Sequence, residues 1–389
     1  MLTLLADADL HTPDHLGVRH VLLAGGRVEW IGTERPSLDP ALVEVWELDG
    51  RPVVPGLVDG HVHLSGGGGE AGPTSSVPPL PVEALTRHGV TTAVGLLGTD
   101  DVVRTPASLL RRVAALRHEG LSAWMLSGGY HLPAATVTGD VATDLLHLEP
   151  VLGVGEVAIG DHRGSHPTVQ QLLELAGRVR AGALLAGKRG SIHLHLGDDP
   201  AGTDLLDQVL QRQAVPVAHW HPTHVNRSEE VLDAAVDLAI RHRVRIDVTA
   251  FPADDPGATA AAAVVTAMDR GVPLGQLTCS SDAGGSLPRF DEQGRTTGLG
   301  VGDASGLLRT VHELVARGID LEAALRPVTA TPADQLGLAE VGRIAPGTRA
   351  DLLVLGEDLQ LLHVVAGGRV HVRDGEQHIR STITTEADQ

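Results

Sequence analysis

Cysteine, aromatic side chains and long apolar stretches are scarce in this chain of 389 residues. The one cysteine, Cys279, excludes an intrachain disulfide and is typical of a reducing compartment. Aromatic residues make up 2% of the chain, so leucine, valine and alanine must build the core from the 42% of residues that are hydrophobic. No segment approaches the roughly 18 apolar residues needed to cross a bilayer, and the N-terminus does not resemble a signal peptide. We therefore expect a soluble, cytoplasmic protein.

Positive charge is also in short supply. The 30 lysine and arginine residues are outnumbered by 49 acidic residues, which gives a formal net charge of −19, and Lys188 is the only lysine. Nucleic acids and anionic membranes bind basic surfaces. We expect neither of them as a partner.

The hydropathy pattern divides the chain into β-rich ends and an alternating middle. Short apolar strands separated by Gly-Gly turns occur near both termini, and they predict a small β-sandwich domain built from residues 1–54 and 335–389. Between residues 55 and 334, segments with apolar residues at helical spacing alternate with short apolar runs. Buried parallel strands are apolar throughout, so we expect strands at residues 54–64, 92–97, 123–126, 154–159, 191–196, 215–219, 244–248 and 277–281.

Eight strand–helix units in about 280 residues match the size and rhythm of a (β/α)8 TIM-like barrel, whose chemistry lies at the C-terminal ends of the strands. The fold class is therefore α/β. A doubly wound open sheet is the alternative arrangement of the same elements.

The most informative motif is His61-Val62-His63, which closes the first apolar run of the middle segment. Residues two apart in a strand point the same way, so both imidazoles should emerge side by side at the strand's end. Neutral imidazole is a good ligand for zinc and similar divalent ions. Taken alone, the motif could equally be two polar residues at the end of a strand.

Further acids and histidines recur at the ends of later strands, namely Glu156, His195, His224 and Asp282. Two metal ions need four to five ligands each, and a carboxylate can bridge them about 3.5–4 Å apart. We expect one metal to be held by His61, His63 and Asp282, and the other by His195 and His224, with Glu156 spanning both. A water between two such ions has its pKa lowered toward about 7 and becomes a bridging hydroxide. Asp282 is then placed to take the proton and transfer it to a leaving group.

These motifs resemble a known superfamily. Four of them occur in the order seen in amidohydrolases: residues 61–64, 195, 222–224 and 280–282. Within the superfamily, four segments are similar to the isoaspartyl dipeptidases (β-aspartyl peptidases): residues 61–74, 94–100, 161–163 and 222–227. The similarity runs nearly end to end. It implies a (β/α)8 barrel, two zinc ions, hydrolysis of the β-peptide bond of isoaspartyl dipeptides, and a homo-oligomer, octameric where this is known.

The substrate of that family makes sense of three charged residues. An isoaspartyl dipeptide carries an ammonium group and two carboxylates, which Glu70 and the pair Arg163 and Arg227 could bind. The arginines could instead form salt bridges with neighbouring acids. The resemblance implies substrate contacts for four more residues, Gly68, Thr99, Tyr130 and Ser286. Tyr130, the only tyrosine, looks like the residue that hydrogen-bonds the developing oxyanion.

One position departs from the family. Isoaspartyl dipeptidases often bridge their metals with a carboxylated lysine on the fourth strand, where this chain has Glu156. Lys188 precedes the fifth strand and should face the opposite end of the barrel, so no lysine carbamate can form at the bridge. Glutamate offers the same two oxygens and the same charge on a shorter arm. We interpret it as a functional replacement.

Three hypotheses remain open from the sequence. The first is a binuclear metallo-dipeptidase for isoaspartyl dipeptides. The second is a related amidohydrolase that acts on another N-acyl amino acid or a cyclic amide, although a cyclic amide needs neither Glu70 nor the two arginines. The third is an inactive scaffold, which the intact ligand set disfavours.

Overall fold

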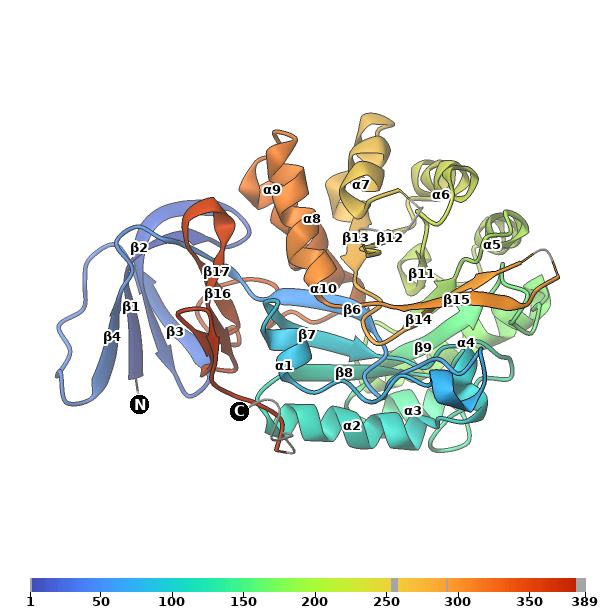
Figure 1. The fold of residues 1–389 in the computed structure, drawn as a ribbon, viewed down its shortest axis with the longest axis horizontal. Coiled ribbons are helices and arrows are strands. Elements are labelled where there is room, and N and C mark those ends of the chain that lie inside the picture. The colour runs from blue at the N-terminus through green and yellow to red at the C-terminus, as the bar shows by residue number, and fades with distance from the viewer. Residues whose placement is uncertain (1, 253–257, 292, 383–389) are drawn as a thin grey trace.

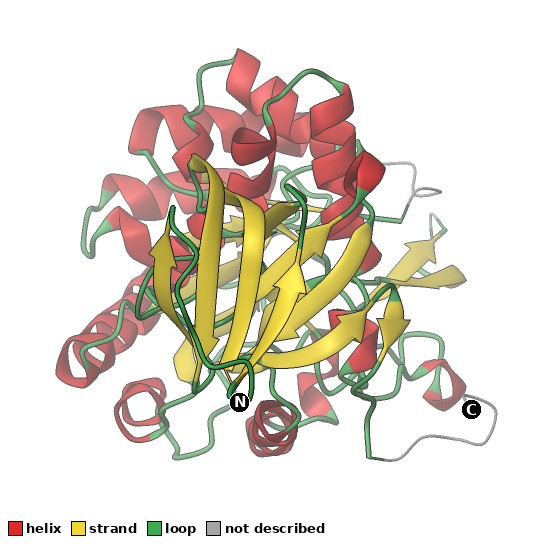
Figure 2. Cartoon of the chain, turned by 90° about the vertical axis from the view of Figure 1, so that its left-hand side faces the viewer, coloured by secondary structure: helices red, strands yellow, loops and turns green. Residues whose placement is uncertain are grey.

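The structure is a computed structural model that describes residues 2–252, 258–291 and 293–382. A large sheet stands beside a barrel of strands and helices (Figure 1), and this sheet faces the viewer in Figure 2, with the barrel's helices behind it. None of the helices among the described residues combines the length and hydrophobicity that a membrane span requires.

The large sheet joins the two ends of the chain. Its nine strands follow the order β19-β18-β17-β16-β5-β1-β2-β3, and β4 pairs with β1. The strands are β1 (Leu2–His11), β2 (His15–Ala24), β3 (Arg27–Gly32), β4 (Val43–Glu47), β5 (Pro52–Pro55), β16 (Leu352–Leu355), β17 (Leu361–Ala366), β18 (Arg369–Arg373) and β19 (Glu376–Gln377). Gly25 and Gly26 turn the chain between β2 and β3 with positive φ angles of 57° and 80°, as a tight hairpin requires.

Strand β5 makes the junction between the two ends. It pairs with β1 in parallel and with β16 in antiparallel orientation. The expected union of both termini is therefore present as one hydrogen-bonded sheet. The predicted sandwich is not confirmed, and the domain boundaries at residues 54 and 335 stay a prediction.

Eight parallel strands form the barrel: β6 (Leu57–Val62), β7 (Val90–Gly95), β8 (Ser122–Ser127), β9 (Val151–Ala158), β10 (Ser191–His195), β11 (Trp220–Thr223), β12 (Ile246–Thr249) and β13 (Leu277–Ser280). Strands β6 to β11 pair in sequence, and β12 pairs with β13. The ring closes because β11 lies against β12 and β13 against β6, where Val62 bridges Ala283. The expected TIM barrel is confirmed, and the open sheet is not the arrangement that the chain adopts.

The helices are α1 (Glu83–Thr86), α2 (Pro106–His118), α3 (Val141–His147), α4 (Val169–Ala186), α5 (Ala201–Gln211), α6 (Glu229–His242), α7 (Ala260–Asp269), α8 (Ser305–Ala316), α9 (Leu321–Leu325) and α10 (Ala330–Leu336). Thr105 and Thr168 begin α2 and α4 with capping boxes, which satisfy free N–H groups of the first turn. Helix α10 covers the amino ends of the strands, since Gln335 donates to the carbonyl of Ala218 just before β11. The opposite, carboxyl ends are left for the site.

Two expected strands are shifted. The run 54–64 is divided between β5 and β6, so its first residues belong to the large sheet. The run predicted at 215–219 is wrong, because Val217–His219 forms a 3-10 turn that the His219 N–H closes on the carbonyl of Pro216. Proline offers no N–H to a ladder, and pairing with β10 begins only at Trp220.

A hairpin that the sequence did not suggest follows the last barrel strand. It consists of β14 (Ser286–Phe290) and β15 (Thr296–Val301), paired antiparallel. Ser286 at its start and Phe290 at the end of β14 both lie beside the site described next.

Candidate metal centre

The six predicted metal ligands meet inside the carboxyl end of the barrel. They come from the ends of β6, β9, β10 and β11 and from the turn after β13, and all are buried, namely His61, His63, Glu156, His195, His224 and Asp282. They fall into overlapping groups whose ligand atoms lie within 4.8 Å of one another. Barrel closure thus brings together residues that are up to 221 positions apart, from 61 to 282.

Glu156 lies in the middle of this group. Its Oε1 atom is 2.9 Å from His224 Nε2 and also contacts His195 Nδ1. Its Oε2 atom lies 3.5 Å from His61 Nε2 and 3.8 Å from His63 Nε2. Each carboxylate oxygen therefore faces a different pair of histidines, which is the arrangement expected of a bridging ligand.

Asp282 completes the half of the site that contains His61 and His63. Its Oδ1 atom is 3.4 Å from His61 Nε2 and 3.2 Å from His63 Nε2. Neither Asp282 Oδ1 nor His61 Nε2 has a hydrogen-bond partner within the part of the chain that the structure describes. Buried polar atoms are normally paired, so these converging unpaired atoms fit a divalent cation.

The backbone is strained at two of these ligands. His224 and Asp282 have positive φ angles of 63° and 55°, in a region that costs non-glycine residues about 1–3 kcal/mol. The Nδ1 atom of His224 is held 2.7 Å from the hydroxyl of Thr249, which turns its Nε2 atom toward Glu156.

The cluster of acids shapes the local charge. Burial alone would raise the pKa of Glu156, but His61 and His195 hold it well below its usual range. Burial would likewise lower the pKa of His61, but the charges of Glu156 and Asp282 raise it to about 9. In the absence of a cation, the charge of the two carboxylates is thus offset by a proton retained on His61.

The predicted recognition residues lie beside the metal ligands. Ser286 donates to Glu70 Oε1 at 2.6 Å, and Arg163 Nη1 lies 3.3 Å from the same atom. Glu70 Oε2 is buried without a partner among the described residues. Arg227 stacks over the Phe251 ring, and its Nε atom has no hydrogen-bond partner among the described residues but lies 3.9 Å from Asp198 Oδ1.

Asp161 is a site residue to which the sequence analysis gave no role. Its carboxylate accepts from Arg163 Nη2 at 2.6 Å and lies 3.0 Å from His195 Nε2. The salt-bridge alternative for Arg163 is thus present in the ligand-free chain. The signal was available in the sequence, because Asp161 stands two residues before Arg163 in a family motif.

Tyr130 connects this group to the histidines. Its hydroxyl lies 3.0 Å from His195 Nδ1. Burial, reinforced by the charge of Glu156, raises the pKa of Tyr130 well above its ordinary value. The phenol therefore keeps its proton and can donate a hydrogen bond.

One small cavity unites the predicted site. Every predicted ligand and substrate contact lines it except His61, which lies fully buried behind it, and Gly98 and Asp100 complete the lining. A Cβ atom on Gly98 would lie 2.8 Å from His63 Cε1, so a glycine is needed here to leave room for that ligand. A wider pocket of about 540 Å³ adjoins the cavity and shares Arg163 and Arg227 with it.

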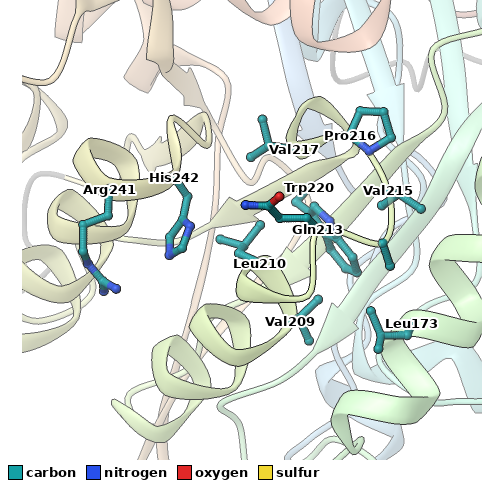
Figure 3. A pocket seen from close by; sticks show the side chains of 11 residues that line it. Leu173, Val209, Leu210, Gln213, Val215, Pro216, Val217, Trp220, Arg241 and His242 are labelled. Carbon is teal, nitrogen blue, oxygen red and sulfur yellow. The ribbon is translucent and has the colours of Figure 1, made fainter.

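Another pocket, of about 530 Å³, is shown in Figure 3. It is lined by the end of α5 and by residues 213–217, which precede β11, so it lies toward the amino ends of the strands. Aliphatic residues and Gln213 line it, and its charged residues Arg241 and His242 are already bound to Asp207. None of the predicted site residues lines it.

Lys188 lies where the sequence analysis placed it, far from the bridge. Its Nζ atom donates to the carbonyls of Leu145, Leu148 and Val151 at 2.8 Å each. These carbonyls belong to the end of α3 and the start of β9, at the amino end of the barrel. The lysine thus caps a helix and takes no part in the metal centre.

Known proteins resemble the chain over most of its length. A crystal structure of a β-aspartyl dipeptidase from Fervidobacterium islandicum AW-1, in complex with the β-Asp-Leu dipeptide, has a TM-score of 0.90 and 32% identity, and the match covers 97% of this chain and 99% of that one. A dihydropyrimidinase from Brevibacillus agri shares the fold, with a TM-score of 0.70 and 15% identity over 99% of this chain and 100% of that one.

Curated relatives are more distant and carry other names. An adenine deaminase from Ruegeria pomeroyi is 22% identical over 95% of this chain, which spans only 56% of that protein. A dihydroorotase from Lactiplantibacillus plantarum is 23% identical over 92% of this chain and 90% of that protein. The amidohydrolase family model matches residues 53–371. The chain therefore belongs to the amidohydrolase family and, within it, is similar to the β-aspartyl dipeptidases.

Proposed function

We propose that the chain hydrolyses the β-peptide bond of isoaspartyl dipeptides with two divalent metal ions, zinc being the expected metal. The observation that carries the proposal is the placement of Glu70, Arg163 and Arg227 in the same cavity as the six metal ligands. An isoaspartyl dipeptide has an ammonium group and two carboxylates for which such residues are suited.

The residues present fit the metal ions. His61, His63 and Asp282 would hold one ion and His195 and His224 the other, with Glu156 between them because each of its oxygens faces one histidine pair. When bound, such ions supply Lewis acidity, which polarises a carbonyl and lowers the pKa of a water molecule.

Asp282 and Tyr130 then have separate tasks. The Asp282 carboxylate accepts a proton from the attacking water and delivers it to the amine that leaves, as a general acid–base group does. The Tyr130 hydroxyl, protonated because its pKa is raised, donates a hydrogen bond to the oxygen on which negative charge develops.

Substrate orientation falls to the charged residues. The free Oε2 atom of Glu70 is available for the ammonium group, while Ser286 fixes the other oxygen. Arg227 Nε makes no hydrogen bond among the described residues, its ion pair with Asp198 is long at 3.9 Å, and the side chain adjoins the wider pocket, so it suits a substrate carboxylate. The residue released by hydrolysis would occupy that pocket, whose volume of about 540 Å³ suits side chains of different sizes.

The names of the relatives define the competing substrates. Adenine carries neither an ammonium group nor a carboxylate. Dihydroorotate carries a carboxylate but no ammonium group, so both substrates would leave Glu70 without a partner. The β-aspartyl dipeptidase match, at 32% identity over almost the whole of both chains, favours the dipeptide.

A rate comparison tests the proposal. Zinc-loaded protein should hydrolyse β-Asp-Leu with a kcat/KM far above that for α-Asp-Leu, dihydroorotate, a hydantoin or adenine. Arg227→Met should raise KM for β-Asp-Leu, whereas Arg241→Met, far from the cavity, serves as the matched control. Turnover of adenine or a cyclic amide in preference to the dipeptide would refute the assignment. Light scattering would test the further expectation of a homo-oligomer of up to eight subunits.

A further inference from the structure

A chain of buried hydrogen bonds runs from the metal centre into the barrel interior. His61 Nδ1 lies 2.9 Å from His193 Nε2, and His193 Nδ1 lies 3.0 Å from His221 Nδ1. His221 Nε2 is then 2.9 Å from the Thr278 hydroxyl, which donates to Asp247 Oδ1 at 2.5 Å. All five residues are at most 3% exposed.

This chain crosses the middle of the barrel. His61 comes from β6 and His193 from β10, which are not neighbours in the sheet. Their side chains can meet only across the interior, a place that barrels usually fill with branched apolar residues. Polar groups buried there are costly unless each one is paired, so their presence calls for a role.

Asp247 sets the direction of every bond in the chain. Its carboxylate accepts from three hydroxyl groups, those of Thr223 (2.7 Å), Ser280 (2.5 Å) and Thr278. An ionised carboxylate only accepts hydrogen bonds, so the Thr278 proton points to Asp247. The Thr278 oxygen is thereby left to accept from His221.

The donor and acceptor roles of the three imidazoles follow from this. A neutral imidazole has one nitrogen that donates and one that accepts. His221 donates from Nε2, so its Nδ1 accepts from His193 Nδ1. His193 Nε2 must in turn accept from His61 Nδ1. His61 thus carries a proton on Nδ1, and Nε2, which faces Glu156 and Asp282, is the nitrogen at which a metal ion would bind.

We propose that the buried Asp247–Thr278–His221–His193 chain holds a proton on Nδ1 of His61, so that Nε2 is the nitrogen that a metal ion would bind. These four are positioning residues, because they act on the metal only through His61. The inference rests on the proposed role of His61 as a metal ligand and does not depend on which substrate is hydrolysed. Hydrogen-bond partners of this kind typically change metal affinity by about 10–100-fold when they are removed.

The tautomers can be observed in the unmodified protein without metal or substrate. Long-range ¹⁵N–¹H correlation spectra of the metal-free protein, labelled at histidine, report which ring nitrogen carries the proton. We expect His193 protonated at Nδ1 and His221 protonated at Nε2, with peaks assigned through single substitutions. His193 protonated at Nε2, or an equal mixture of its two forms, would overturn the proposal.

Matched variants test the consequence for the metal. Thr278→Val removes the hydroxyl that orients His221. Thr223→Val removes another fully buried hydroxyl, which also donates to Asp247 but is not part of the row of hydrogen bonds that leads to His61. Zinc affinity, measured by chelator competition, should fall about 10–100-fold in Thr278→Val and less than threefold in Thr223→Val. Thr278→Ser should restore both the affinity and the tautomers.

The outcomes separate this inference from the proposed function. Equal losses of zinc affinity in Thr278→Val and Thr223→Val would mean that the hydrogen-bonded residues only contribute to packing of the barrel, and would refute the inference. Normal tautomers and affinities in a protein that fails to cleave β-Asp-Leu would leave the inference intact and refute the substrate assignment instead. Should Thr278→Val not fold, the tautomers of the unmodified protein still decide the matter.

Discussion

Replacing Glu156 should release a metal ion in proportion to the charge that is removed. The carboxylate is 1% exposed and lies 2.9–3.8 Å from His61, His63 and His224. At an effective dielectric constant of about 20, two unit charges 3.5 Å apart interact by about 5 kcal/mol. Breaking a buried charge pair by removing one partner typically costs about 3–5 kcal/mol. That range corresponds to a loss of about 10²- to 10⁴-fold in affinity.

Three variants test how the loss of metal depends on the charge at position 156. Glu156→Ala should lose the second metal first, because the remaining ligands His195 and His224 are neutral. Glu156→Gln keeps the shape without the charge and should fall between Ala and the natural residue. Asp100→Asn is the matched control, since Asp100 is a buried carboxylate of the same cavity whose ion-pair partner is Arg104. It should retain both ions.

The assay is reconstitution of apo-protein with zinc in CO2-depleted buffer, followed by elemental analysis and by turnover. The unmodified protein should bind two ions and recover full activity, because a glutamate bridge needs no carbamate. Glu156→Lys gives a positive control, since a lysine at this position could form its carbamate only when bicarbonate is supplied. The reasoning fails if bicarbonate raises the activity of the unmodified protein several-fold, or if Glu156→Ala holds two ions and turns over normally.

Three further predictions concern neighbouring residues. Asp282→Asn should lower kcat by several orders of magnitude with an unchanged circular dichroism spectrum, because an amide cannot accept the proton from water; more than a tenth of the original kcat would remove Asp282 from its role. N-acetylation of the substrate should lower kcat/KM of the unmodified protein by the equivalent of about 2–5 kcal/mol, and should lower kcat/KM of Glu70→Gln only slightly. Equal losses in the two proteins would mean that Glu70 does not bind the ammonium group. Burial lowers the pKa of His61, but Glu156 and Asp282 raise it to about 9 in the metal-free chain, so zinc must displace a proton below that pH. Calorimetry in buffers of different ionisation enthalpy should detect this proton release and an affinity that weakens as the pH falls, and an affinity independent of pH between 7 and 9 would contradict it.

The sequence was most informative where periodicity and position coincide. His61 and His63 are two residues apart at the end of an apolar run, so strand geometry alone predicts that they face one point. Glu156 and His195 follow from the same reasoning at later strands, and barrel closure explains why they meet. Seven of the eight barrel strands could be located because buried parallel strands are apolar throughout.

Other features depend on contacts between distant segments. The Gly-rich hairpin β14–β15 lacks the apolar run that marks a buried strand, and its residues are mostly half-exposed or exposed. The strand at Trp220 was misplaced because Val215 and Val217 look like strand residues, whereas the residues after Pro216 form the 3-10 turn Val217–His219. In the sequence, Asp247 and Thr278 look like ordinary strand residues. Their role depends on histidines far along the chain: His221 is 26 positions before Asp247, and His61 is 217 positions before Thr278.

Lys188 gives the protein an unusual chemical profile. It is the only side-chain amine in the sequence, and three carbonyl groups already surround it at the opposite end of the barrel from the metal centre. Reagents that acylate or alkylate lysine therefore have a single, engaged target, and the modification should leave the histidines and carboxylates of the site untouched. A lysine-specific protease can cut the chain only once, between α4 and β10, and would divide the barrel into two fragments that each carry part of the ligand set.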